Sequence, residues 1–397
     1  MGELSAVRPG TDLSRHAREL VRVHDAVLGG RSAPARPRAV VARSWSRVLR
    51  TGLDPDGANA RDPHPREEVE RRRRESPLHL IVGELAQVIQ HVALLVVTDA
   101  DGVILWRVGG PAVLRRADTL GFGEGATWTE STVGTNAIGT ALVEAAPVQL
   151  FSAEHFEQAQ HAWYCSAHPI HDPRTGELLG IVDVSGPALT LHPAIAALVE
   201  TGVRLAESRL WRHHAARLDR LRRSAEHVVS TATGPLLVVD DHGWVAHHAG
   251  VAVRDRIAVP RADTALAVPG LGLCLPERLA EGWIVRPAGP AAGIRASLDR
   301  TGAPVLSVAG EDSLWRAPLT RRHAEILTLL HAAGPQGLSA GRLSRALYGD
   351  DAHVVTVRAE VSRLRKAIGA LVATGPYRLA PGVSWEVVGA AGPLPEV

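Results

Sequence analysis

Residues 93–106 decide the fold of the first half of the chain, and they read ALLVVTDADGVILW. An apolar run leads into an acidic turn that ends at Gly102, and a second apolar run follows, so an antiparallel hairpin is predicted. Residues 234–245, GPLLVVDDHGWV, repeat this order of apolar run, acidic turn and apolar run. We therefore expect a second, smaller and degenerate sheet module built on the same kind of hairpin.

Further strands and helices surround the first hairpin. Residues 148–150, 165–170 and 178–185 have the short apolar runs that are typical of strands. Residues 192–229 carry leucines amid arginines with almost no proline or glycine, which predicts a long amphipathic helix. This helix is expected to be an interdomain connector or a dimer seam. The pattern as a whole indicates an α+β multidomain protein with an antiparallel sheet.

The pattern changes after residue 317 to three helices and two strands. Thr320, Ser339 and Thr356 are each predicted to cap the start of a helix. Residues 377–379 and 385–388 are predicted to pair with each other as a hairpin. Three helices followed by a hairpin is the order of a winged helix-turn-helix.

Length and composition exclude several classes of protein. The 397 residues are 45% apolar and 22% charged, too apolar for disorder throughout and long enough for several domains. The net charge of +2 argues against a protein that coats a polyanion, so contact with nucleic acid must be local. The only lysine, Lys366, follows no glycine-rich loop, which excludes a P-loop ATPase within this sequence.

Cysteine usage and hydropathy predict the compartment. Cys165 and Cys274 are too few for a disulfide framework or a four-thiolate zinc site. No apolar run reaches the roughly 18 residues of a membrane span, and the first residues lack a signal-peptide pattern. We expect a cytoplasmic protein with no membrane partner.

The third helix of the carboxy-terminal segment is the candidate DNA-binding element. At 100° per residue, Val357, Val361, Leu364 and Ile368 fall on one side and are expected to be buried. Arginine, serine and lysine on the other side suit base edges and phosphates in a major groove. The alternative is an ordinary amphipathic surface helix. The candidate DNA-binding residues, including one from the predicted hairpin, are Arg358, Ser362, Arg363, Arg365, Lys366 and Arg378.

Two resemblances to known families refine these predictions. Residues 319–327 and 356–365 resemble the winged-helix output domains of bacterial transcription regulators. Residues 127–142, the Glu154-His155-Phe156 motif and residues 165–172 resemble the GAF sensory domain of bacterial acetoin-type activators. The second resemblance implies a small-molecule pocket. Those activators usually continue into an ATPase domain that acts on polymerase, and that mechanism is not carried over to this sequence.

The candidate ligand-binding residues lie in the segment that resembles the GAF domain, and three of them are aromatic residues that would line its pocket. Aromatic walls suit an apolar or cyclic ligand, although the same rings also suit a plain core. The ligand itself and any cofactor are not identified by the sequence. The candidate ligand-binding residues are Trp128, Glu130, Thr135, Asn136, Phe156 and Trp163.

A metal or redox sensor is the first alternative function. His155, His161 and Cys165 are the best candidate metal ligands, because imidazole and thiolate suit zinc or iron. Structural histidines that bond to loop backbone are the competing interpretation. The apolar neighbours of Cys165 argue for a buried and inert thiol. A protein–protein signalling module without DNA binding is the second alternative. No nucleophile–base pair is evident, so an enzyme is not expected.

These inferences combine into a one-component, ligand-responsive transcription regulator that does not act as an enzyme. Its expected partners are operator DNA, a small effector, a second copy of the chain in a homodimer, and RNA polymerase. The expected domains are 1–76, an amino-terminal helical region and linker; 77–190, a GAF sensory domain; 191–232, a long connecting helix; 233–316, a small PAS/GAF-like β-rich module; and 317–397, a winged helix-turn-helix.

Overall fold

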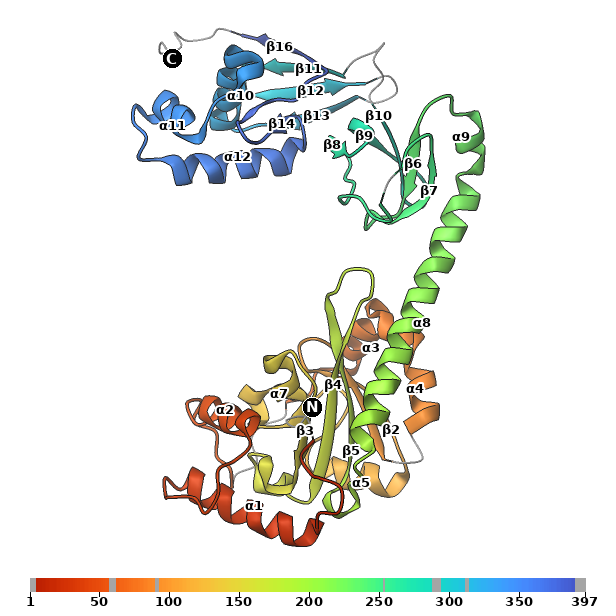
Figure 1. The fold of residues 1–397 in the computed structure, drawn as a ribbon, viewed down its shortest axis with the longest axis vertical. Helices are drawn as coiled ribbons and strands as arrows, with labels where there is room; N and C mark the ends of the chain where they lie inside the picture. Colours follow the sequence, from red (N-terminus) through yellow and green to blue (C-terminus); the bar gives the residue numbers. More distant parts are fainter. Residues whose placement is uncertain are drawn as a thin grey trace. The chain divides into compact units, whose positions relative to one another are not determined.

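The computed structural model describes residues 5–56, 62–89, 93–252, 254–287, 294–310 and 314–389. The chain forms two compact units, Met1–His214 and Ala215–Val397 (Figure 1). The elements that begin in the first unit are α1 Leu13–Leu28, α2 Ala39–Val48, α3 Arg66–Glu75, η1 Pro77–Leu80, α4 Val82–Ile89, β1 Leu94–Thr98, β2 Ile104–Val108, α5 Pro111–Asp118, α6 Glu130–Val133, α7 Ala137–Glu144, β3 Val148–Phe151, η2 Ser152–Glu154, η3 Gln158–Gln160, β4 Trp163–His171, β5 Leu178–Pro187, η4 Ala188–Thr190 and α8 Ile195–Ser224.

The second unit contains the last residues of α8 and three further sheets. Its elements are α9 Glu226–Thr231, β6 Leu236–Val239, β7 Val245–Ala249, β8 Leu266–Val268, β9 Gly272–Arg278, β10 Trp283–Pro287, β11 Ile294–Asp299, β12 Val305–Ala309, β13 Leu314–Pro318, α10 Arg321–Ala333, η5 Gly334–Gln336, α11 Ala340–Tyr348, α12 Val354–Ile368, β14 Val372–Ala373, β15 Arg378–Leu379 and β16 Val383–Val388.

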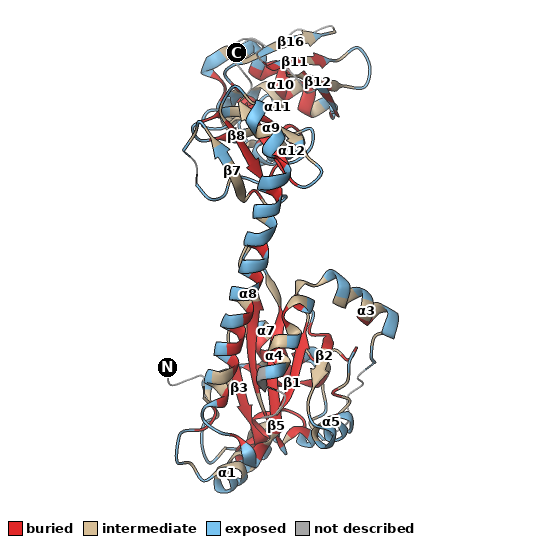
Figure 2. Cartoon of the chain, turned by 90° about the vertical axis from the view of Figure 1, so that its right-hand side faces the viewer, coloured by how far each residue is buried: buried red, intermediate tan, exposed pale blue. Residues whose placement is uncertain are grey.

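A five-stranded antiparallel sheet in the order β2-β1-β5-β4-β3 forms the centre of the first unit. All five strands predicted there are present. Both faces of the sheet are covered, and every residue of β1 is buried (Figure 2). Leu94 and Val96 face a core shared with α2 and α7, whereas Leu95 and Val97 face a core shared with the first half of α8. Alternate side chains therefore point into two different cores.

The sheet of β6 to β10 repeats the strand order of the first sheet, because β7-β6-β10-β9-β8 is the same arrangement in new numbers. The acidic turns correspond as well. Asp99 Oδ1 accepts hydrogen bonds from the backbone N–H groups of Asp101 and Val103, both at 3.0 Å. Asp240 Oδ1 accepts from His242 at 2.9 Å and from Trp244 at 2.8 Å. The two hairpins therefore share their strand order and the side-chain hydrogen bonds of their turns, as the repeated sequence pattern predicts.

The third sheet corrects the predicted carboxy-terminal hairpin. Residues 377–379 and 385–388 do not pair with each other: β15 pairs with β14, and β16 lies parallel to β11 over six residues. Alternate residues Val383, Trp385 and Val387 of β16 pack against the core beneath α10 to α12, and β11 offers a longer partner than β15. Strands β11 to β13 consequently share a sheet with β16, and the expected boundary at 316/317 falls inside β13.

The three carboxy-terminal helices are present, and two of the three predicted caps are confirmed. Thr320 Oγ1 accepts from the backbone N–H of His323 at 3.1 Å, and Ser339 Oγ accepts from that of Arg342 at 3.2 Å. The predicted cap at Thr356 is wrong, because α12 begins at Val354 and its N-cap residue is His353. Among the described residues, no helix has the length and apolar character needed to cross a bilayer.

Candidate functional site

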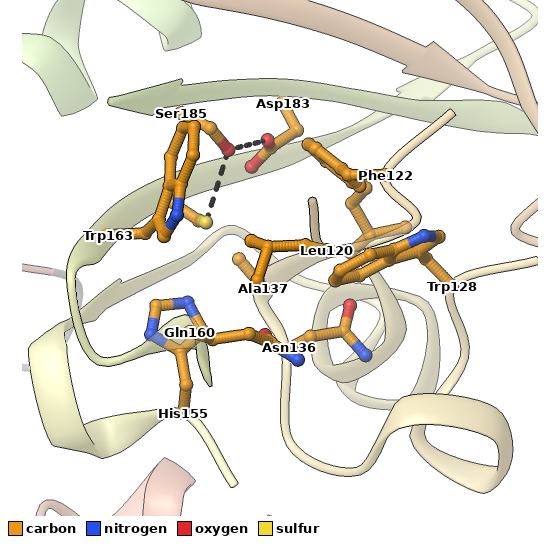
Figure 3. A pocket seen from close by; sticks show the side chains of 12 residues that line it. Leu120, Phe122, Trp128, Asn136, Ala137, His155, Gln160, Trp163, Asp183 and Ser185 are labelled. Carbon is orange, nitrogen blue, oxygen red and sulfur yellow. Dashed lines mark hydrogen bonds between the residues drawn. The ribbon is translucent and has the colours of Figure 1, made fainter. Parts of the chain in front are cut away.

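A small cavity lies in the first unit between the sheet and α7. The space open to the centre of a water-sized sphere is about 20 Å³, which is room for about one water molecule. Three predicted ligand-binding residues line it: Trp128, Asn136 and Trp163. Figure 3 shows the two indoles and the ring of Phe122 around it, with Asp183 at one end and His155 at the other. The walls are aromatic and the polar groups are few.

Two buried acceptors in the cavity wall have no hydrogen-bond partner among the residues that the structure describes. Asp183, on β5, is fully buried, and its Oδ1 is unpartnered whereas its Oδ2 accepts from the hydroxyl of Ser185 at 2.5 Å. His155 is also fully buried, and its Nδ1 lies 2.9 Å from the carbonyl oxygen of Ser152. That carbonyl can only accept, so Nδ1 carries the proton and the unpartnered Nε2 is an acceptor.

Burial controls the protonation of both groups. Burial raises the pKa of Asp183 to about 7, against the opposing effect of the Ser185 hydrogen bond. Burial lowers the pKa of His155 to about 4, so its imidazole is neutral near pH 7. A buried polar atom without a partner is costly, and a bound molecule with hydrogen-bond donors would relieve that cost at both ends of the cavity.

Asn136 is a predicted ligand-binding residue in the cavity wall, and its side-chain amide already has hydrogen-bond partners within the fold. Its Oδ1 accepts from the backbone N–H of Gly139 at 2.8 Å, which makes it the N-cap of α7. Its Nδ2 donates to the carbonyl oxygen of Gly134 at 2.9 Å. Asn136 therefore shapes the cavity wall chiefly by fixing the start of α7.

Cys165 faces the cavity but is not a reactive thiol. It lies 3.1 Å from the Ser185 hydroxyl, on the same face of the sheet as Asp183. Burial raises its pKa well above the ordinary value, and the nearby carboxyl of Asp183 raises it further. A thiolate is thus disfavoured at neutral pH, which argues against a redox sensor at Cys165. His168 lies on the opposite face of β4, as strand alternation predicts.

The predicted metal trio does not form a site. Among the described residues, which include His155, His161 and Cys165, no three His, Cys, Asp or Glu side chains come together in a way that could hold a metal ion. The ring of His161 packs edge-on against that of His24, with centroids 4.6 Å apart. Burial lowers the pKa of His161 to about 4 as well. His155 bonds to loop backbone through Nδ1, as the competing interpretation expects.

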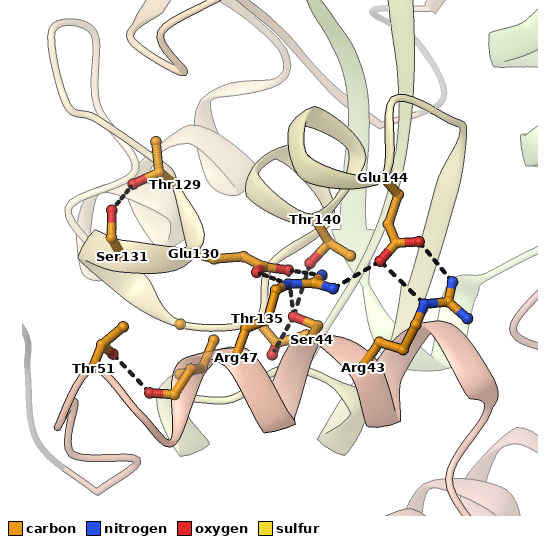
Figure 4. Close-up of polar contacts among 12 residues, drawn as sticks. Arg43, Ser44, Arg47, Thr51, Thr129, Glu130, Ser131, Thr135, Thr140 and Glu144 are labelled. Atoms are coloured by element: carbon orange, nitrogen blue, oxygen red, sulfur yellow. Dashed lines mark hydrogen bonds and ion pairs between the residues drawn. The ribbon is translucent and has the colours of Figure 1, made fainter.

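Glu130 and Thr135 belong to a buried polar cluster rather than to the cavity wall (Figure 4). The carboxylate of Glu130 accepts from the hydroxyl of Ser44 at 2.5 Å and from the guanidinium of Arg47. The hydroxyls of Ser44 and Thr135 are 2.7 Å apart. Since Ser44 and Arg47 lie on α2, the cluster fastens α2 to the motif that opens with Glu130.

The Glu154-His155-Phe156 motif holds the amino-terminal helices in the same way. Two hydrogen bonds join Arg38 to the carboxylate of Glu154, and Trp45 Nε1 donates to the carbonyl oxygen of Glu154 at 3.1 Å. His24 Nε2 lies 2.9 Å from the carbonyl oxygen of Phe156, whose ring is in the core. Only His155 of the motif lines the cavity.

Sequence reasoning missed the partners on α1 and α2 and the acid on β5. The sequence of the amino-terminal helices does not indicate that they contact the sensory motifs, because their polar residues are typical of an ordinary solvent-exposed helix face. A signal for Asp183 was present in residues 178–187, where one carboxyl interrupts an otherwise apolar strand and shares a face with Cys165. A carboxyl side chain on the inner face of an apolar strand is buried on folding, and acidic residues are rarely buried without a specific role.

The candidate DNA-binding residues lie on the exposed surface of the second unit. Val357, Val361, Leu364 and Ile368 are buried, as the helical count predicts. Arg363 donates to the carboxylate of Glu360 at 2.6 Å, and Arg365 Nε donates to the carbonyl oxygen of Val372 at 3.0 Å. All six predicted side chains are exposed, five on α12 and one on β15: Arg358, Ser362, Arg363, Arg365, Lys366 and Arg378.

Comparisons with known proteins were made for the whole chain. The profile of the MimR N-terminal domain family matches residues 23–207. The acetoin dehydrogenase operon transcriptional activator AcoR of Bacillus subtilis is 35% identical, over 44% of this chain and 30% of its own length. Among solved structures, the E. coli DhaR(N)–DhaL complex matches 62% of this chain and 97% of the other, with 17% identity and a TM-score of 0.44.

Part of the chain is thus similar to the acetoin-type transcriptional activators and to the MimR activators. One relative spans far more of it. The uncharacterized 47.3 kDa protein of the thcA 5' region of Rhodococcus erythropolis is 32% identical over 387 residues, which are 94% of this chain and 72% of that protein. The chain belongs to the same family as this Rhodococcus protein. It spans less than a third of the length of the Bacillus activator.

Proposed function

We propose that the chain is a one-component transcription regulator, in which the first unit binds a small effector and the second binds operator DNA. The single observation that carries the sensor half is the aromatic cavity with two unpartnered buried acceptors, Asp183 Oδ1 and His155 Nε2. An apolar cavity with a few convergent polar groups is the usual form of a small-molecule site.

The first unit is proposed to be a GAF-type sensory domain. The strand order β2-β1-β5-β4-β3, with α7 on one face and α8 on the other, supports this assignment. The proposed effector is a small, largely apolar molecule that would widen the cavity between Trp128 and Trp163 on binding and donate hydrogen bonds to Asp183 and His155. The smaller sheet of β6 to β10 is proposed to be a degenerate module of the same type.

The carboxy-terminal part is proposed to be a winged helix-turn-helix that begins at β11. Support comes from the order of three helices and short strands, and from the outward basic face of α12. Arg358, Ser362 and Lys366 lie on this face and are the proposed contacts to base edges and phosphates. Differential binding of the effector to two arrangements of the chain would couple the two halves.

A homodimer is proposed as the working form. A single winged helix makes few base contacts, and paired half-sites multiply them. Sedimentation of the purified chain checks this proposal, and a monomer at micromolar concentration would contradict it.

A selection experiment tests the DNA-binding half. The full chain is used to enrich duplexes from a random pool of about 25 base pairs, and the expected result is a recurrent motif with two related half-sites. Arg358→Ala is expected to enrich a motif that is less defined at one or two positions, because a lost bidentate contact costs about 1–3 kcal/mol of discrimination. Failure of the wild-type chain to enrich any motif would contradict the proposal and favour a protein–protein signalling module.

A further inference from the structure

A basic groove runs between α12 and the sheet of β6 to β10 in the second unit. One side is the exposed face of α12, and the other is the segment 258–267, which ends in β8. The groove includes about 1330 Å³ of empty space, open to solvent. Among the described residues that line it, four are basic and none is acidic: Arg261, Arg358, Arg365 and Lys366.

The two sides of the groove are joined by backbone contacts at the end of α12. Ala265 forms an isolated β-bridge with Gly369, and the backbone N–H of Ala370 donates to the carbonyl oxygen of Ala265 at 2.8 Å. Ala265 is buried in the same core as Val357 and Val361 of α12. The position of segment 258–267 is therefore fixed by packing as well as by hydrogen bonds.

Gly369 makes this close approach possible. Its φ of +67° is in the left-handed region, and a Cβ placed there would lie 2.0 Å from the carbonyl oxygen of Ala265. Any other residue would push segment 258–267 away from α12. The sequence thus specifies the junction, and Arg261 stands four residues before the anchored Ala265.

Four cations around one groove repel one another unless an anion lies between them. All four side chains are exposed, so the groove keeps its charge in contact with solvent. A chain of phosphates fits the uniform positive charge of the groove, and arginine is the side chain best suited to phosphate oxygens. The α12 side of the groove is the face already proposed to bind DNA.

We propose that the groove holds a sugar-phosphate strand of the bound DNA, with Arg261 as a phosphate contact supplied from outside the helix-turn-helix. The proposal rests on the DNA-binding function proposed above. It extends the DNA-binding surface into the module of β6 to β10, which thereby acquires a role in binding. Phosphate contacts are independent of base sequence, so the proposal is testable without knowledge of the operator.

The test measures the binding of the full chain to a fluorescent random-sequence duplex of about 30 base pairs, by anisotropy between about 50 and 300 mM KCl. Arg261→Gln is expected to weaken binding about threefold to tenfold at about 100 mM salt, and to lower the slope of log K against log salt by about 0.9. Arg254→Gln is the matched control, since Arg254 is exposed in the same module but does not line the groove. It removes the same charge and is expected to bind like the wild type.

Several results would overturn the proposal. Equal affinity and slope for Arg261→Gln and wild type, with binding lost in Arg358→Ala, would confine DNA to the helix and leave the proposed function intact. Tighter binding by Arg261→Gln would mean that the segment masks the helix, and would make the groove inhibitory. Loss of binding in Arg254→Gln equal to that in Arg261→Gln would reduce the effect to net charge. Absence of DNA binding by the wild type would remove this proposal together with the function on which it rests.

Discussion

Arg47 on α2 and Glu130 at the start of α6 form a two-point ion pair, with Nε 2.7 Å from Oε2 and Nη2 2.8 Å from Oε1. The side chain of Glu130 is 8% exposed and that of Arg47 is 28% exposed. This pair makes the amino-terminal helices part of the sensory unit. The motif that begins at Glu130 therefore has two tasks: it docks α2, and through α7 it forms one wall of the cavity.

Removal of one partner of this pair is expected to destabilise the first unit. Glu130→Gln removes one of the two carboxylates paired with Arg47, whose Nη1 also lies 2.9 Å from Glu144 Oε1, at an expected cost of about 1–3 kcal/mol. Urea denaturation measures the loss. Arg15→Ala is the control, because it breaks a fully solvated pair with Glu19 and is expected to leave the midpoint unchanged. Equal midpoints for Glu130→Gln and wild type would contradict the docking role.

Two helical glycines are expected to respond in opposite directions to alanine. A Cβ at Gly139 on α7 would lie 2.5 Å from the backbone nitrogen of Glu130, so Gly139→Ala must displace backbone and is expected to cost about 2 kcal/mol. A Cβ at Gly83 on α4 meets nothing within 4 Å. Gly83→Ala is therefore expected to stabilise the chain by about 0.5–1 kcal/mol. Calorimetry of both variants checks the prediction, and destabilisation by both would contradict it.

Asp183 is expected to make stability depend on pH. Its pKa in the folded chain is raised by burial to about 7, from 3.8. A carboxyl shifted upward contributes stability that is complete below about pH 4 and is lost as the pH rises towards 7. Asp183→Asn has no such loss, so its stability relative to wild type is expected to rise with pH across this window, by up to about 1.4 kcal/mol per pH unit.

The buried His155 does not confuse this comparison. Burial lowers its pKa to about 4, so its contribution is complete above about pH 6.5 and is lost as the pH falls. The contribution is present in wild type and variant alike, and it cancels in their difference. Denaturation midpoints measured at several pH values give that difference. A difference that stays constant from about pH 4 to pH 7 would contradict the raised pKa of Asp183.

The helix starts of the carboxy-terminal part are expected to differ in their response to alanine. Ser339 caps α11 with its hydroxyl, so Ser339→Ala is expected to cost about 1 kcal/mol. Thr356 lies inside the first turns of α12 and is exposed, so Thr356→Ala is expected to gain a few tenths of a kcal/mol from higher helix propensity. Thermal melts of the two variants decide the matter. A loss at Thr356 similar to that at Ser339 would restore the cap first predicted there.

The elements that depend on local pattern were predictable from sequence. The two hairpins follow from apolar runs around an acidic turn, and the buried side of α12 follows from residues spaced three and four apart. The pairing of β16 with β11 was not predictable, because some ninety residues separate the strands and their alternation fits several partners. The aromatic wall of the cavity was predicted in Trp128 and Trp163. The role of Glu130 was not, because its partner Arg47 is remote in sequence and belongs to a segment without a motif.

The affinity of the full chain for a duplex carrying its selected motif is the most direct measure of the account. Wild type is compared with the double variant Arg358→Ala/Lys366→Ala, whose side chains point outward and leave the α12 core intact. The account predicts that the variant keeps its melting temperature and loses affinity by about 100-fold or more. Equal affinity of the two proteins for that duplex would contradict DNA binding through α12.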